Sequence, residues 1–168
     1  MLPPETIDTF FQQHLPYRLG MLRTWPCHFA NSRTQNHAVG ICAYEASLIA
    51  TRMFICFLGI GLDRNTQKLH SLKNKKDDDD VWIDDLGGLR PSDLELFSLD
   101  EMEALALIDD YTSKASAHLT TRADVIGSST SLERDRALVI SAFALSQSID
   151  QNLYDETQRT WVAWEIIK

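Results

Sequence analysis

The feature that most constrains the fold is the stretch from Ala38 to Leu62, about 25 residues that contain only two charges, Glu45 and Arg52. A helix that is apolar almost all the way round is buried inside a protein or spans a membrane. The stretch therefore predicts one long helix at the centre of a helical bundle.

The two charges in this stretch argue against a membrane span. The stretch is long enough to cross a bilayer, but a charge at the bilayer centre costs about 2.5–3.5 kcal/mol on insertion scales. Glu45 and Arg52 are seven residues apart, so they share one face of the helix, and they need partners where they are buried. Two interpretations stay open: the pair fixes the register of packed helices, or it lines a ligand pocket between helices.

Length and composition indicate one soluble helical domain over residues 1–168. A chain of 168 residues lies in the usual range for one domain and needs neither a disulfide nor a metal for stability. The net charge of −8 opposes a general affinity for nucleic-acid phosphates, so we expect no DNA binding. The N-terminus lacks the pattern of a secretory signal. The three cysteines are odd in number and lack the spacing of a disulfide framework, so we expect a cytoplasmic location.

Shorter helices are expected on either side of the central one. Helices are predicted at 4–14 and 17–25, with Pro16 and Pro26 as the residues that end them, because proline removes a helical hydrogen bond. Leu69 and Leu72 suggest a further short helix over residues 64–73.

The segment near 74–97 interrupts the helical pattern. Its four adjacent aspartates, Asp77–Asp80, repel one another, and Gly87-Gly88 follows them. Between these lies Val81-Trp82-Ile83, which we interpret as a short extended segment or as a hydrophobic peg over one end of the bundle.

Three helices are predicted in the last part of the chain. Ser98 and Glu101 have the spacing of a capping box and open a helix that runs to about residue 121. A second helix over 131–153 has apolar residues three and four apart, which is typical of an amphipathic helix. A third helix is expected over 156–167. The predicted fold is all-α, an antiparallel bundle of about five to six helices with an irregular acidic insert near 74–97.

Common catalytic and cofactor motifs are absent from the sequence. It has no H-E-x-x-H, no Walker P-loop, no dinucleotide fingerprint and no G-x-S-x-G. The aspartate run lacks the glycine and glutamate of an EF-hand loop. We therefore expect no cofactor and no metal.

His118 is the first candidate catalytic residue. On a helix, Lys114 lies one turn away from it, and Tyr111 and Asp110 lie about two turns away. A histidine beside a carboxylate and a phenol is suited to proton transfer. The alternative is a helix histidine that is hydrogen-bonded to a neighbour.

The second candidate is the stretch from Arg64 to His70, which resembles the HEPN superfamily of helical-bundle proteins. The motif of that family is an arginine, often followed by a polar residue such as Asn65 here, with a histidine four to six residues later. The resemblance implies a metal-independent RNase or RNA-binding protein of a toxin–antitoxin or defence system, with Arg64 and His70 as the catalytic pair. Such proteins usually dimerise so that two motifs meet. Arg23 and His28 match the same spacing, and residues 114–118 match a degenerate form.

The leading functional hypothesis is a non-catalytic binding or regulatory module that acts through protein–protein contacts. Trp82, Trp161 and Trp164 are aromatic anchors of the kind that stabilise interfaces, and we expect a homodimer or a protein partner. Glu45 and Arg52 are the candidate lining of a ligand pocket. The alternative is the HEPN-like RNase, with RNA as its partner.

Overall fold

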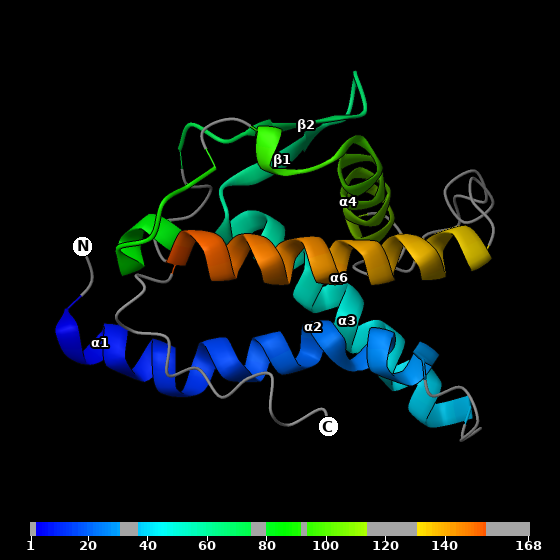
Figure 1. Cartoon of the computed structure of the whole chain (residues 1–168), viewed down its shortest axis with the longest axis horizontal. Coiled ribbons are helices and arrows are strands. Elements are labelled where there is room, and N and C mark those ends of the chain that lie inside the picture. The colour runs from blue at the N-terminus through cyan, green and yellow to red at the C-terminus, as the bar shows by residue number, and fades with distance from the viewer. Residues whose placement is uncertain (1–2, 31–36, 75–79, 92–93, 114–130, 154–168) are drawn as a thin grey trace.

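The computed structural model describes residues 3–30, 37–74, 80–91, 94–113 and 131–153 (Figure 1). These residues are mostly helical and include one antiparallel sheet of two strands. The helical class is thus confirmed, with the small sheet as an exception. The count of five to six helices stays a prediction, because residues 114–130 and 154–168, which include the helix expected over 156–167, lie outside the described residues.

The N-terminal helices form one continuous helical run. Helix α1 spans Pro4–Thr9, a π-helical turn spans Phe10–His14, and α2 spans Leu15–Ala30. The predicted break at Pro16 is wrong: the helical run continues through it, and the π-helical turn that ends at His14 already interrupts the i→i−4 pattern that a proline disrupts. The predicted end at Pro26 is also wrong, because α2 continues through this residue.

Tertiary packing offsets the cost of Pro26, which is about 3 kcal/mol in a helix interior. The ring of Trp25 stacks on His28 at 5.7 Å and meets the edge of Tyr44 at 5.0 Å. The contact with Tyr44 ties the last turns of α2 to α3, so the local preference to end the helix is overridden.

Helix α3 spans His37–Phe57 and is shorter than predicted. Gly59 has a φ of 70°, a left-handed conformation that glycine adopts without strain. The chain then forms β1, Ile60–Asp63, which pairs with β2, Lys68–Ser71. The prediction of a helix that reaches residue 62 is therefore wrong.

The predicted helix over residues 64–73 is also wrong, because the turn and β2 occupy this stretch. A carboxylate oxygen of Asp63 accepts a hydrogen bond from the backbone N–H of Asn65 at 2.9 Å, and the other oxygen accepts one from the Thr66 hydroxyl at 2.9 Å. Side-chain hydrogen bonds of this kind favour turns over helices.

Small polar residues let α2 and α3 approach closely. The buried Ser47 hydroxyl donates to the Leu22 carbonyl at 2.7 Å, and the Thr24 hydroxyl donates to the Ala43 carbonyl at 2.9 Å. At Gly40 a Cβ atom would lie 2.9 Å from Nε2 of a histidine on α2. These hydrogen bonds satisfy side chains that would otherwise be buried at a cost.

Burial of α3 is one-sided rather than complete. Within the described chain, Ala38–Phe57 is the one helix whose length and hydropathy would allow it to cross a membrane, and 39% of its most apolar window is buried. One side contacts α2, α4 and α6, and several apolar side chains on the other side are exposed. The helix predicted at the centre of the bundle is therefore buried on one side only.

Two more helices complete the described core. Helix α4 spans Leu99–Tyr111 and α6 spans Ser131–Leu153, which confirms α4 as far as it is described and confirms the prediction of α6. The Ser98 hydroxyl accepts a hydrogen bond from the Glu101 N–H at 3.3 Å, and the glutamate accepts one from the Ser98 N–H at 2.8 Å, as the capping box requires.

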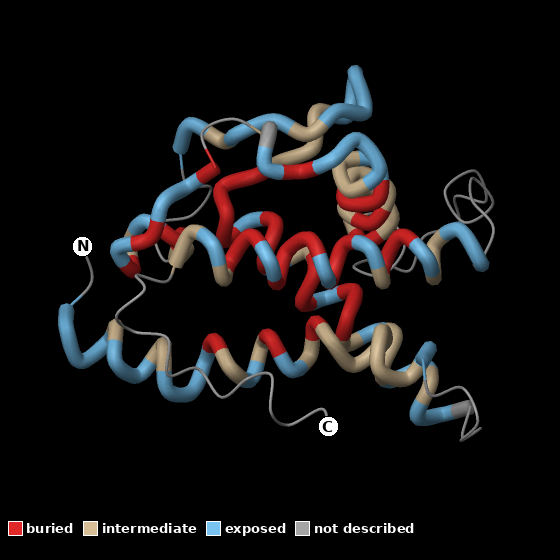
Figure 2. Tube along the Cα trace, viewed as in Figure 1, coloured by how far each residue is buried: buried red, intermediate tan, exposed pale blue. Residues whose placement is uncertain are grey.

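The helices pack with their buried sides together. In Figure 1, α6 crosses the middle of the view, α2 lies along its lower side, and α3 runs obliquely between them. Figure 2 shows the buried residues concentrated where α2, α3, α4 and α6 face one another. Aliphatic side chains dominate this core, and its fully buried members include Leu22, Ile55, Leu105, Leu138 and Leu145.

The insert near 74–97 is irregular, as predicted, within the residues described. It contains two short 3₁₀ helices, Ile83–Leu86 and Leu94–Leu96. The N–H of Leu89 donates to the carbonyl of Asn152 at 2.9 Å, so the insert is fastened to the last turn of α6. The insert thereby forms a wall beside α3.

Candidate functional site

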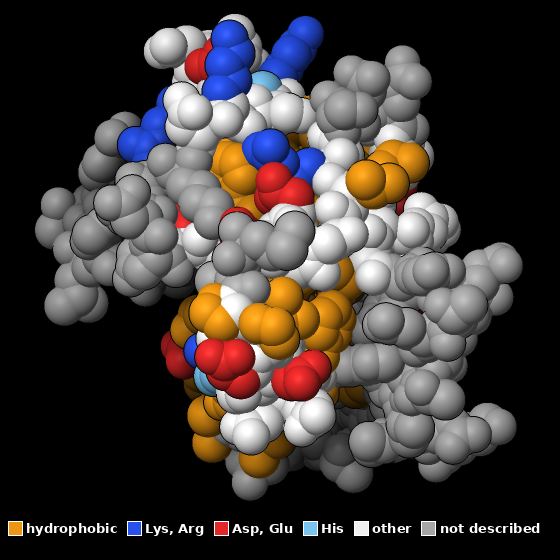
Figure 3. All heavy atoms as spheres, turned by 90° about the vertical axis from the view of Figure 1, so that its left-hand side faces the viewer, with side chains coloured by type: hydrophobic (Ala, Val, Ile, Leu, Met, Phe, Trp, Pro, Cys, Tyr) orange, Lys and Arg blue, Asp and Glu red, His pale blue; other side chains and the backbone are white. Residues whose placement is uncertain are grey.

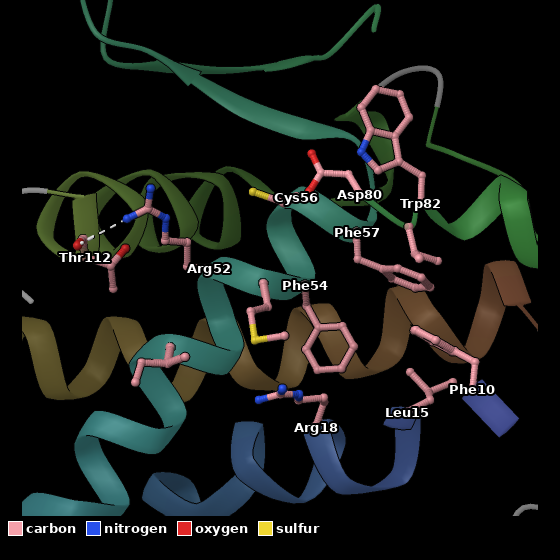
Figure 4. A pocket seen from close by; sticks show the side chains of 13 residues that line it. Phe10, Leu15, Arg18, Arg52, Phe54, Cys56, Phe57, Asp80, Trp82 and Thr112 are labelled. Atoms are coloured by element: carbon pink, nitrogen blue, oxygen red, sulfur yellow. Dashed lines mark hydrogen bonds between the residues drawn. The ribbon is translucent and has the colours of Figure 1, made fainter. Parts of the chain in front are cut away.

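A pocket of about 610 Å³ lies beside α3 (Figure 4). Helix α3 supplies nearly half of its lining, and the rest comes from the N-terminal helical run, the insert and the end of α4. The volume lies within the range of small-molecule sites. The lining side chains are mostly apolar or aromatic: Phe10, Leu15, Ile49, Met53, Phe54, Cys56, Phe57, Val81 and Trp82, with Arg18, Arg52, Asp80 and Thr112 as the polar and charged members.

Helical spacing brings the α3 side chains to the pocket. Ile49, Arg52, Met53 and Cys56 are three and four residues apart, so they lie on one side of the helix. On α2, Leu15 and Arg18 are three residues apart and face the same space. The pocket is therefore a consequence of two helix faces that meet at an angle.

Trp82 forms the wall on the side of the insert. It is 4% exposed, and its backbone N–H donates to a carboxylate oxygen of Asp85 at 2.7 Å, which holds the start of the 3₁₀ helix. The Arg90 guanidinium covers its ring at 4.7 Å and forms an ion pair with Asp84 at 3.1 Å. The backbone of Trp82 is thus fixed by Asp85, and its ring is covered by Arg90.

Figure 3 shows the face of the molecule that carries α1 and the insert. Hydrophobic side chains gather in its lower half, over the N-terminal helical run, with acidic side chains among them. Basic and acidic side chains lie side by side in the upper half. Among the described side chains, this face is therefore mixed in character and shows no continuous basic patch of the kind that binds nucleic acid.

The two arginines of the pocket are the main feature of its electrostatics. Arg52 donates to the Thr112 carbonyl at 3.5 Å, and Arg18 donates to the sulfur of Met21 at 3.5 Å and lies over the ring of Tyr17 at 5.3 Å. Within the described part of the chain, neither guanidinium has a carboxylate at ion-pair distance. Most of their N–H donors are therefore available to a ligand.

The pocket has an apolar end, and its two basic side chains come from two different helices. Figure 4 shows Phe10 and Phe57 near each other at one end, Arg52 beside Thr112 at the other end, and Arg18 on α2 next to Phe54. The Asp80 carboxylate lies at the rim, next to Trp82. Two guanidiniums and one carboxylate leave the lining with a net positive charge.

Asp109, on α4, is partly desolvated. Burial raises its pKa above the usual range, and the nearby Arg52 and Arg64 guanidiniums oppose that rise. The field of Arg52 therefore reaches α4, although the two side chains are not at ion-pair distance.

Only some of the residues that the sequence predicted for binding line the pocket. Arg52 and Trp82 both line the pocket, whereas Glu45 is exposed and is not part of the lining. Trp161 and Trp164 lie outside the described residues. The sequence singled out Arg52 by its charge within an apolar stretch, but Arg18 and the phenylalanines lacked a local signal.

The predicted catalytic residues lie away from the pocket lining. Arg64 is exposed in the turn between the strands, and His70 is exposed on β2, where it pairs with Gly61. His118 lies outside the described residues. Hydrogen bonds from Asn65 and Thr66 hold the pKa of the Asp63 carboxyl, in the same turn, below its usual range.

An aromatic cluster lies at the other end of α3. Burial raises the pKa of Tyr44 to about 12, and the neighbouring Tyr111 adds to that rise. The Arg134 guanidinium lies over the Tyr111 ring at 5.0 Å. Sequence periodicity assigned these residues to helices but gave no sign that they meet.

Neither a metal centre nor a known relative assigns a function. The residues that the structure describes contain no group of three or more histidine, cysteine or acidic side chains placed to hold a metal. No protein-family model, no curated protein and no solved structure matches this chain. The functional argument therefore starts from the pocket.

Proposed function

We propose that this protein is a non-catalytic binding module that binds a small ligand with an apolar body and one negative charge in the pocket beside α3. The observation that carries the proposal is the pair of guanidiniums, Arg18 and Arg52, which line a largely apolar pocket and have no carboxylate at ion-pair distance among the described residues. Both arginines are half-buried, and an opposite charge stabilises a partly desolvated charge, so an anion bound in the pocket beside either guanidinium would be stabilised.

The shape of the lining narrows the class of ligand. Arginine forms charge-assisted hydrogen bonds with carboxylates, often in bidentate geometry. The phenylalanine end suits an aliphatic or aromatic body, which gains about 25 cal/mol for each Å² of apolar surface removed from water. A monocarboxylate with a medium-length apolar body meets both requirements, and Asp80 at the rim would repel a second acidic group.

Ligands with one apolar body and different charges test the proposal. Decanoate, decanol and decyltrimethylammonium have a similar body and carry a negative, zero and positive charge. Isothermal titration calorimetry should show decanoate binding at least about ten-fold tighter than decanol, since charge-assisted hydrogen bonds contribute about 1.5–3 kcal/mol. The cationic ligand should bind most weakly.

Variants in which one arginine is replaced by the uncharged glutamine test whether decanoate binds in this pocket. Arg18→Gln and Arg52→Gln should each weaken decanoate binding about ten-fold, which corresponds to about 1.4 kcal/mol, and should leave decanol binding unchanged. Arg136→Gln is the matched control, because Arg136 is exposed on α6 and lies outside the lining. Equal affinity for decanoate and decanol, or an equal loss in all three variants, would overturn the proposal.

A further inference from the structure

One face of α3 carries a row of side chains that are exposed, except for the half-buried Arg52, and that include apolar residues. Ile49 is 50% exposed, Cys42 and Cys56 are exposed, and Glu45 and Arg52 lie in the same row. Their numbers follow one another at alternating intervals of three and four. This is the spacing at which a helix pairs with another helix along a seam.

The row is self-complementary in charge. In an antiparallel pair of identical helices, each residue meets the residue placed symmetrically about a two-fold axis. The midpoint between Glu45 and Arg52 and the midpoint between Cys42 and Cys56 both fall at Ile49 to within half a residue. At about 1.5 Å per residue, the positions of the two-fold axis that the two residue pairs require differ by less than about 1 Å along the helix.

We infer that this face of α3 is a homodimer interface, with a second copy of this chain as the occupant. The two α3 helices run antiparallel, and Ile49 packs on its own copy at the two-fold axis. Glu45 of each copy meets Arg52 of the other, and Cys42 meets Cys56. The opposite charges, which recur in both halves of the interface, select this register over parallel pairing, in which like charges would meet.

The interface also concerns the pocket. Ile49, Arg52, Met53 and Cys56 line it, so a second copy that packs on these residues would take up space at the pocket and limit access to it. Glu45 of that copy would then compete with a bound carboxylate for Arg52. This coupling rests on the proposed function, whereas the interface itself does not.

Disulfide cross-linking tests the register. In a Cys27→Ser background, mild oxidation should produce a covalent dimer whose linked peptides join Cys42 to Cys56. Variants that keep only Cys42 or only Cys56 should give several-fold less, because equal positions lie about 21 Å apart along antiparallel helices, beyond the Cα separation of a disulfide. Efficient Cys42–Cys42 linkage would indicate parallel pairing and overturn the inference.

Charge reversal tests the contact without a disulfide. In sedimentation equilibrium under reducing conditions, Glu45→Arg and Arg52→Glu should each raise the dimer dissociation constant at least about ten-fold, and the double variant should restore it. Glu103→Arg, an equal charge change at an exposed position on α4, should have no effect. Circular dichroism checks that each variant keeps its helix content.

The outcomes separate the two proposals. The double variant should dimerise like the natural chain and still bind decanoate poorly, because it lacks the Arg52 guanidinium. If the natural chain does not bind decanoate, the proposed function fails, but the double variant should still restore dimerisation. A monomeric natural chain, no rescue in the double variant, or a monomer that binds phospholipid vesicles through this face would overturn the interface.

Discussion

Replacement of Gly88 by alanine should loosen the wall that the insert builds beside the pocket. A Cβ atom at this position would lie 2.6 Å from Cγ1 of Ile83, 2.9 Å from the backbone oxygen of Asn152 and 3.0 Å from Cδ1 of Leu153. The aliphatic side chains are able to move, but the backbone oxygen belongs to the last turn of α6. The insert must therefore shift away from α6.

The expected loss in the free energy of unfolding has two contributions. Overpacking costs about 1–3 kcal/mol, and loss of the hydrogen bond from Leu89 to Asn152, 2.9 Å long, costs about 0.5–1.5 kcal/mol. We expect Gly88→Ala to lower the free energy of unfolding by about 2–4 kcal/mol. For a chain of 168 residues, this lowers the melting temperature by roughly 5–15 °C.

Urea and thermal unfolding, followed by circular dichroism, measure the stability of Gly88→Ala. Variants of two other glycines serve as controls in these experiments. Gly87 has a φ of 85° but open space around its Cα, so Gly87→Ala should cost only about 1–2 kcal/mol of backbone strain. Gly20 lies in α2 with nothing within 4 Å, so Gly20→Ala should stabilise the protein by about 0.4–1 kcal/mol. A Gly88→Ala variant that is as stable as Gly87→Ala would refute the reasoning.

Three further predictions concern other parts of the chain. Burial raises the pKa of Tyr44 to about 12, above the value of about 10 in the unfolded chain. The contribution of Tyr44 to stability should therefore be complete below about pH 10 and be lost as the pH rises towards 12. In urea unfolding, the stability of Tyr44→Phe should depend less on pH over this range, and ultraviolet absorbance should follow the ionisation of Tyr44 in the natural chain. Ser98→Ala removes the acceptor of the Glu101 N–H and should cost about 0.5–2 kcal/mol in urea unfolding, whereas Ser98→Thr should cost less. Under the HEPN-like hypothesis, His70→Ala should abolish metal-independent RNA cleavage, and full activity in both His70→Ala and His118→Ala would exclude it.

Local patterns in the sequence were sufficient for the amphipathic helices. The i, i+3, i+4 spacing over 131–153 predicts α6, and the Ser98–Glu101 spacing predicts the start of α4. These features depend on contacts within one or two turns, which a linear pattern records directly.

Breaks and ends of elements were predicted poorly because distant contacts decide them. Pro16 and Pro26 lie inside α2, where a preceding π-helical turn and the packing of Trp25 on Tyr44 outweigh the local preference. The stretch after Gly59 forms a strand because residues 68–71 are available to pair with it.

What the sequence by itself determined is the helical class, the two amphipathic helices and the unusual position of Arg52 in an apolar stretch. Only the tertiary structure decided which side of α3 is covered, because burial depends on the other helices that pack against it. It also decided that Arg18, Arg52 and Trp82 share one pocket, since these residues meet through the crossing of helices and not through their spacing along the chain.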